Sequence, residues 1–126
     1  MYNVKIRGHM MIAHSLPDKF FGPAQNLHGA TYITDVTFYS KTLDIHNVVI
    51  DIGLVEKILH DTIEPLQYQN LDELPQFKRN LTTTEFLAKY VHDQIKEKVK
   101  SFFNGSISVT LGESHIAWAT YEGEML

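Results

Sequence analysis

Histidines are the residues best suited to chemistry in this chain, because its 126 residues include seven histidines and no cysteine. Without thiols the chain can form no disulfide, thiolate zinc site or cysteine nucleophile. His14 and His28 lie in or beside segments that alternate as strands, and pairing of these strands would bring the two imidazoles together. Imidazole is a good zinc ligand, but a catalytic zinc site needs three protein ligands. Two histidines alone leave both a metal site and an ordinary hydrogen-bonded pair open.

A second candidate pair lies near the C-terminus, where Glu113 and His115 are two residues apart. In extended backbone, side chains two residues apart face the same side of a strand. A carboxylate beside an imidazole can work as an acid–base pair, since histidine titrates near neutral pH. The alternative is a polar turn between two strands, which the same two residues would also suit.

Four strands are predicted from alternating apolar and polar residues, at about residues 3–15, 28–39, 106–110 and 115–121. Residues 16–25 and 66–81 are predicted as loops. Gly112 is predicted to mark a turn or kink between the last two strands. The first two strands are expected to pair as an antiparallel hairpin.

Two amphipathic helices are predicted between the second and third strands. Asp51 is a suitable N-cap for the first helix, which Pro65 ends. The stretch from Thr82 to Glu85 fits a capping box, with Thr82 as the N-cap and Glu85 three residues later. This second helix is expected to run to about Lys100.

The resulting order is β-β-α-α-β-β in one domain covering residues 1–126. A four-stranded antiparallel sheet with two helices on one face is an α+β layer structure. Such a sheet leaves two edge strands unpaired, and proteins cover or pair such edges. Association of several copies through these edges is therefore expected.

Composition argues against two classes of partner. Eleven lysines and arginines against fifteen acidic residues give a net charge of −4, which disfavours nucleic-acid binding. No apolar run approaches the ~20 residues needed to span a membrane. The N-terminus has no long apolar segment typical of a signal peptide, so the cytoplasm is the expected compartment.

Several short motifs, in this order, resemble those of the 6-pyruvoyl-tetrahydropterin synthase and 6-carboxy-tetrahydropterin synthase family. The likeness covers nearly the whole chain, and several motifs in the right order are stronger than any one of them. The matching segments are Met11–Leu16, Leu27–Gly29, Val49–Asp51, Leu66–Leu71 and Thr83–Glu85, followed by Glu113.

The resemblance implies a T-fold, in which the sheets of several subunits join into a barrel, usually as a hexamer made of two trimers. It implies active sites at subunit interfaces, a zinc ion bound by His14 and His28, and a pterin-type substrate. It also implies that Glu113 grips the pterin ring and that Thr84 and Glu85 contribute to substrate binding. A carboxylate suits this role because it accepts two parallel hydrogen bonds.

The sequence also departs from the family pattern at the residues that carry the family's chemistry. The third zinc histidine of the family corresponds to Ala30, and its catalytic cysteine corresponds to Ala24. Its catalytic Asp–His pair corresponds to Gln67 and Tyr68. The standard reaction therefore cannot run through these four positions.

Two main hypotheses follow from this pattern of matches and departures. In the first, the chain is a zinc-dependent lyase-type enzyme with a rebuilt site. His115 then completes the metal site, with His9 as second choice, and Tyr68 donates a proton. In the second, the chain binds a pterin or purine without catalysis. A third, weaker hypothesis is a structural subunit that joins another T-fold protein.

Overall fold

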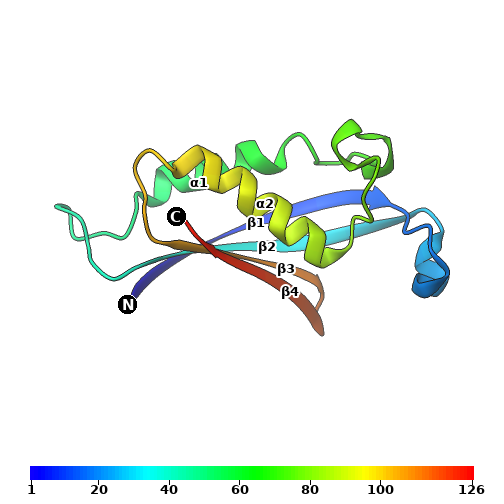
Figure 1. Cartoon of the computed structure of the whole chain (residues 1–126), viewed down its shortest axis with the longest axis horizontal. Coiled ribbons are helices and arrows are strands. Elements are labelled where there is room, and N and C mark those ends of the chain that lie inside the picture. The colour runs from blue at the N-terminus through cyan, green and yellow to red at the C-terminus, as the bar shows by residue number, and fades with distance from the viewer.

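Four strands form an antiparallel sheet in the order β1-β2-β3-β4 in the computed structural model, which describes residues 1–126 (Figure 1). The strands are β1 (Tyr2–His14), β2 (His28–Ser40), β3 (Ser106–Ser114) and β4 (Ala117–Glu124). Strands β1 and β2 pair without a register shift from Tyr2 opposite Ser40 to His14 opposite His28. The predicted antiparallel hairpin and the α+β T-fold arrangement are confirmed.

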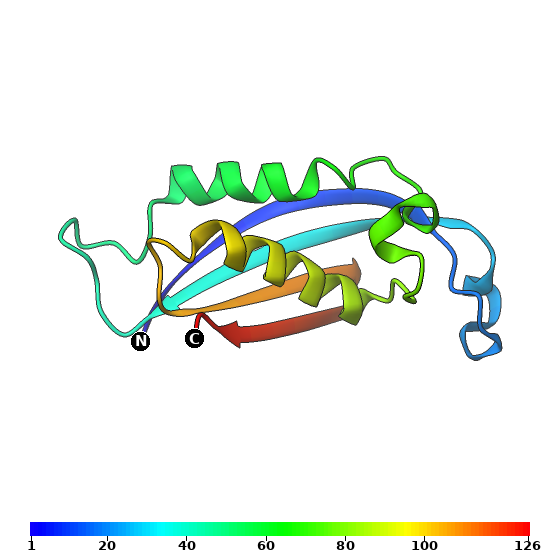
Figure 2. The ribbon, with the colours of Figure 1, turned by 45° about the horizontal axis from the view of Figure 1, so that its top comes forward.

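Two helices, α1 (Ile52–Ile63) and α2 (Thr84–Val99), cover the same face of this sheet (Figure 2). Helix α1 lies along β1, while α2 crosses β3 and β4. Short 3-10 turns occupy Lys19–Gln25, Leu71–Glu73 and Pro75–Phe77 within the predicted loops. Neither α1 nor α2 combines the length and the apolar content that a membrane-spanning helix requires.

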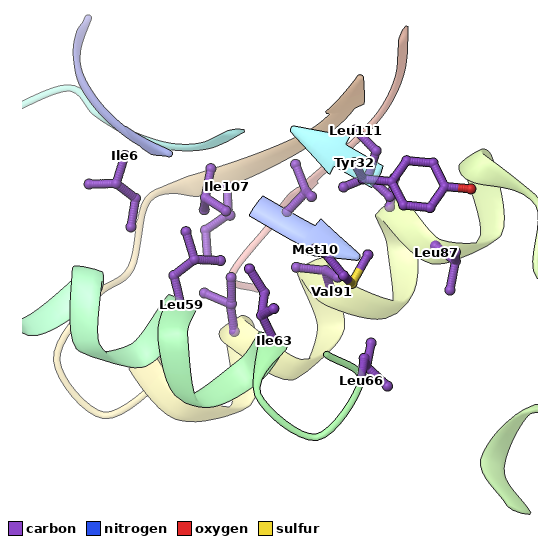
Figure 3. Packing of buried hydrophobic residues seen from close by; sticks show 14 of the residues in the cluster. Ile6, Met10, Tyr32, Leu59, Ile63, Leu66, Leu87, Val91, Ile107 and Leu111 are labelled. Atoms are coloured by element: carbon purple, nitrogen blue, oxygen red, sulfur yellow. The ribbon is translucent and has the colours of Figure 1, made fainter. Parts of the chain in front are cut away.

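The hydrophobic core fills the space between the helices and the sheet (Figure 3). Strand alternation places every second residue on the helix side, so Ile6, Met10 and Ile12 of β1 are buried there. Leu59 and Ile63 of α1 meet them at helical spacing. The opposite, open face of the sheet carries mainly polar residues, as a half-covered antiparallel sheet does.

Helix capping explains where both helices begin. The Asp51 carboxylate accepts a hydrogen bond from the Leu54 N–H, which confirms Asp51 as the N-cap of α1. The prediction for α2 was wrong by one residue, because Thr83 and not Thr82 accepts from the Phe86 N–H. Glu85 is consequently the second residue of α2 and not the third, so it does not complete a capping box.

The hairpin at the C-terminus also differs from the prediction. Strand β3 continues through Gly112 to Ser114, with a bulge between these two residues. Gly112 is not a turn residue but leaves room for Trp118, whose indole lies 3.0 Å from where a Cβ would stand. The true turn lies at His115 and the following residue, so His115 is not in a strand and does not share an extended segment with Glu113.

Candidate functional site

His14 and His28 meet at one end of the sheet, opposite to the end that holds both chain termini. They are the last residue of β1 and the first of β2, and the register places them directly across from each other. Their ring centroids are 4.6 Å apart, with the edge of one ring toward the face of the other. The predicted convergence of these two imidazoles is therefore present, with His14 3% exposed and His28 partly exposed.

Each imidazole is held by one hydrogen bond at its Nδ1 atom. The Nδ1 of His14 lies 2.9 Å from the Thr82 hydroxyl, and the Nδ1 of His28 lies 2.8 Å from the main-chain carbonyl of Asn26. These contacts leave Nε2 as the nitrogen of each ring without a protein hydrogen bond. An imidazole oriented through one nitrogen is ready to use the other on a ligand.

The surroundings of His14 favour its neutral form. Burial lowers the pKa of His14, and the charge of His28 lowers it further. The Asp72 carboxylate, the Thr82 main chain and the Glu113 carboxylate oppose this lowering of the pKa without reversing it. A neutral imidazole keeps a lone pair that can accept a proton or bind a metal ion.

Thr84, Glu113 and Glu85 all influence the Tyr32 phenol. Burial raises the pKa of the Tyr32 phenol, a hydrogen bond with Thr84 opposes this rise, and the charges of Glu113 and Glu85 reinforce it. Figure 3 shows the Tyr32 hydroxyl at the outer end of the ring, on the α2 side of the sheet. The Glu113 charge also acts on His14, as the smallest of the causes that act on the pKa of that imidazole.

His115 and His9, the two candidates for a third metal ligand, are placed less favourably than His14 and His28. His115 is exposed in the β3–β4 turn. His9 is exposed on the open face, because the regular register of β1 gives it the opposite orientation from His14. The chain contains no group of three histidine or acidic side chains placed to hold a metal ion.

The side chains around His14 and His28 can be compared with the ligands that a zinc ion requires. Two imidazoles with free Nε2 atoms have the chemistry of zinc ligands. A third ligand is missing within the chain, since Asp72 is held by the main-chain N–H and hydroxyl of Ser15, at 3.0 and 2.6 Å from one carboxylate oxygen. The donor set of one chain is thus one ligand short of a three-ligand zinc site, and the role of His115 stays a prediction.

Gln67 and Tyr68 lie along the outer edge of β1. The Gln67 side chain accepts from the Met11 N–H at 2.6 Å and donates to the His9 carbonyl at 3.0 Å, as a neighbouring strand would. The Tyr68 main chain continues this pairing by donating to the Met11 carbonyl at 2.7 Å. Tyr68 adopts a φ of 60° and its side chain is 76% exposed.

An open hollow of about 470 Å³ lies where β1, the start of β2 and residues 68–70 meet. Its lining includes Ala13 and Gly29, the chain neighbours of His14 and His28, together with Ala30 and Tyr68. The small residues leave this space open, and the exposed phenol of Tyr68 borders it. The role of Tyr68 as a proton donor there stays a prediction.

Sequence reasoning missed two residues of the site. Thr82 had been assigned to helix capping, although its side chain holds His14. Tyr32 is not among the predicted site residues, although the charges of Glu113 and Glu85 act on its phenol. The signal available for Thr82 was the run of three threonines before α2, of which only one can be the N-cap. For Tyr32 the signal was a phenol at a buried position, because a buried phenol requires a hydrogen-bond partner.

Comparison with known proteins agrees with this arrangement. Residues 3–124 match the model of the family described as 6-pyruvoyl tetrahydropterin synthase. The chain is 23% identical over 116 residues to 6-carboxy-5,6,7,8-tetrahydropterin synthase of Bacillus subtilis, covering 90% of this chain and 80% of that protein. It is 27% identical over 108 residues to 6-pyruvoyl tetrahydrobiopterin synthase of Dictyostelium discoideum, covering 84% and 78%.

Solved structures share the fold over nearly the whole chain. The 6-pyruvoyl tetrahydropterin synthase of Caenorhabditis elegans superposes with a TM-score of 0.80 at 20% identity, covering 97% of this chain and 95% of that one. The corresponding enzyme of Plasmodium vivax gives 0.80 at 16% identity, covering 98% of both chains. Together with the family match over residues 3–124, this shows that the chain belongs to the 6-pyruvoyl tetrahydropterin synthase family.

Proposed function

We propose that this protein is a lyase-type enzyme that acts on a reduced pterin or a related guanine-derived heterocycle. The observation that carries the proposal is the position of His14, which contacts His28 on one side and is close enough to Glu113 to feel its charge. An acidic recognition group whose charge reaches a reactive imidazole supports the proposal, because a binding and reaction site combines the two.

The recognition end consists of Glu113 with Thr84 and Glu85. A carboxylate accepts two parallel hydrogen bonds from the amino group and ring N–H that a pterin presents side by side. Thr84 adds a hydroxyl, and the buried ring of Tyr32 fixes the strand beneath these groups. This end binds and orients the heterocycle.

The reaction end consists of His14 and His28, with Tyr68 and His115 as proposed participants from the rim. A zinc ion bound by the pair and a third ligand, for which His115 is the candidate, would polarise a substrate oxygen. The exposed Tyr68 phenol is proposed as the proton donor from the rim. The neutral imidazole of His14 can accept a proton at Nε2 if no metal is bound.

Pterin binding and turnover test this proposal. Purified protein without a histidine tag is titrated with reduced pterins while the melting temperature and product formation are followed. Glu113→Gln should weaken binding at least tenfold, while the surface variant Glu97→Gln on α2 should bind as the natural chain does. Unchanged affinity of Glu113→Gln would refute the recognition role.

A catalytically inactive pterin binder is the second candidate, and Gln67 is the observation that favours it. Its amide is engaged with the β1 main chain, so it supplies no acid or base where the family pattern has one. On this alternative a pterin raises the melting temperature but no product forms, and His14→Gln leaves pterin affinity unchanged.

We further propose that copies of the chain associate head to tail through the sheet edges, as a homo-oligomer of the hexameric kind. The free part of the β1 edge carries Lys5 and Arg7, and the β4 edge carries Glu122 and Glu124. These residues point to the same open face, in rows that continue across the sheet. Opposite charges on the two edges favour pairing of β1 with β4 of another copy.

Charge reversal tests this association. The double variant Glu122→Lys, Glu124→Lys should be smaller than the natural protein by native mass spectrometry, and adding Lys5→Glu should restore part of the assembly. A natural chain that is monomeric at micromolar concentration would contradict the proposal, whereas co-purification with another T-fold protein would favour the structural-subunit hypothesis.

A further inference from the structure

The outer edge of β1 is divided into a covered part and a free part. Residues 67–69 form a strap along the covered part, where the Gln67 amide donates to the His9 carbonyl at 3.0 Å and accepts from the Met11 N–H at 2.6 Å. The main chain of the next two strap residues continues this pairing to Met11 and Ala13. No hydrogen bond outside the β1–β2 ladder reaches the main chain of residues 2–8. Gln67 therefore marks the point at which the edge becomes free.

The Gln67 amide presents one donor and one acceptor, as a residue of a neighbouring strand would. A free strand edge can take up a further strand through main-chain hydrogen bonds. A strand added to β1 can pair as far as Arg7, but it cannot pair fully at His9, because the His9 carbonyl is already used by the strap. The end of the strap beside Arg7 and His9 is open, with a hollow of about 190 Å³. The Gln67 side chain thus limits how far an added strand can extend.

The β4 edge of a second copy is the partner that fits this free segment. The main chain of Thr120 and Glu122 has no hydrogen bond outside the β3–β4 ladder, and both side chains lie on the same open face as Lys5 and Arg7. The Asp35 carboxylate already holds Arg7 at 2.7 and 3.0 Å, whereas it lies 3.9 Å from Lys5. Lys5 is therefore the cation more available to an acidic residue of another copy.

Charge alone does not select one register for this pairing. A shift by one residue turns every side chain to the other face, so only shifts by two residues compete. A shift by two residues toward the strap would place Glu122 opposite Arg7 and Glu124 opposite Lys5, which gives two pairs of opposite charge. That register needs the His9 main chain, which the strap occupies. The strap therefore excludes a register that the charges would favour.

We propose that the Gln67 side chain sets the register in which a second copy of this chain adds its β4 to the free edge of β1. In this register Glu122 of the second copy lies opposite Lys5. The last pair before the strap then joins Thr120 of the second copy to Arg7. The inference rests on the association of copies proposed above, and it deepens that proposal by naming the opposed residues and the group that selects them.

Disulfide cross-linking measures the register directly, because the chain has no cysteine of its own. Opposed residues in a hydrogen-bonded pair have Cα atoms about 5.5 Å apart, which suits a disulfide, whereas diagonal neighbours at about 7–8 Å are out of reach. The variant with Arg7→Cys and Thr120→Cys should run mainly as covalent oligomers on a non-reducing gel after mild oxidation. Two strands separate β1 from β4 within one copy, so these cysteines can meet only between copies.

Two shifted pairs are the controls. His9→Cys with Thr120→Cys reports a shift by two residues toward the strap, and Arg7→Cys with Trp118→Cys reports the same shift away from it. Both variants keep Lys5 and Glu122, so the pair of opposite charges is retained. Neither variant should form covalent oligomers when Gln67 is present.

Removal of the Gln67 side chain tests its positioning role. Gln67→Ala frees the His9 carbonyl and should allow the pair His9→Cys and Thr120→Cys to cross-link. Gln69→Ala removes a side chain that makes no hydrogen bond, and it should leave the cross-linking pattern unchanged. A side chain that only stabilised the fold would lower the melting temperature without moving the pattern. Melting temperatures also verify that each variant is folded during oxidation.

The outcomes separate this inference from the proposals on which it rests. An unchanged pattern in folded Gln67→Ala overturns the role of the Gln67 side chain. An oligomeric protein in which Arg7→Cys and Thr120→Cys do not cross-link, or in which Arg7→Cys and Trp118→Cys do, overturns the register. A natural chain that is monomeric by native mass spectrometry overturns the association and this inference with it, while pterin binding is decided by its own titration.

Discussion

The Gln67 amide offers a sharp test of the structure, because its two hydrogen bonds to the β1 edge come from one side chain. Gln67→Ala removes both the 2.6 Å bond from the Met11 N–H and the 3.0 Å bond to the His9 carbonyl. A neutral hydrogen bond contributes about 1 kcal/mol net. Because water reaches the vacated strand edge, the loss of unfolding free energy should be about 1–2 kcal/mol and not more.

This loss can be measured as a thermal shift. A chain of this length loses about 4 °C in melting temperature per kcal/mol, so Gln67→Ala should melt about 4–8 °C lower at equal protein concentration. Gln69→Ala is the matched control, since the Gln69 main chain accepts from the Ala13 N–H while its side chain makes no hydrogen bond. Equal melting temperatures for the two variants would refute the assignment.

A charged substitution at the same position adds a pH test. Gln67→Glu keeps the acceptor for the Met11 N–H, but at pH 7 its second oxygen faces the His9 carbonyl, which also only accepts. This repulsion raises the carboxyl pKa in the folded state, so the protonated form regains a donor. The deficit relative to the natural chain should shrink as pH falls toward about 4.3, the ordinary glutamate value. A deficit that grows on acidification would contradict the donor geometry.

Further predictions concern close packing and pH. Gly105→Ala should prevent stable folding, because its Cβ would collide with the Tyr39 carbonyl; circular dichroism shows this. Gly123→Ala places a Cβ 2.9 Å from the His92 ring and should cost about 1–3 kcal/mol in denaturant unfolding. For His14 the folded pKa lies below the unfolded value of 6.5, so the unfolded chain binds more protons and stability falls as pH drops through 6.5. Metal-free His14→Gln should show a weaker loss between pH 7 and 5 by chemical denaturation.

The element order and the meeting of the two histidines were predictable because both depend on local periodicity and strand pairing. Alternation fixes which residues of β1 face the helices, and the antiparallel hairpin then places His14 opposite His28. The loop between them also matters, because turn geometry helps to set the register of a hairpin.

The β3–β4 hairpin was less predictable because a bulge breaks the rule that residues two apart face the same side. Alternation alone placed Glu113 and His115 together, but the bulge before Ser114 and the turn at His115 separate their environments. Glycine was a misleading signal here, since Gly112 makes room for Trp118 and does not turn the chain. Such a close contact across strands is a tertiary feature that no single segment reveals.

Gln67 and Thr82 both make side-chain contacts that the sequence pattern alone does not reveal. Sequence comparison marks Gln67 only as the loss of an acid, whereas the structure shows an amide that completes the β1 edge from His9 to Met11. Thr82 gives the site a hydroxyl that orients His14. If the site were merely decaying, a buried hydroxyl bonded to a buried imidazole would have no consequence for ligands, and Thr82→Val would change stability alone. A change in pterin affinity at unchanged fold would therefore favour a rebuilt site over a degenerate one.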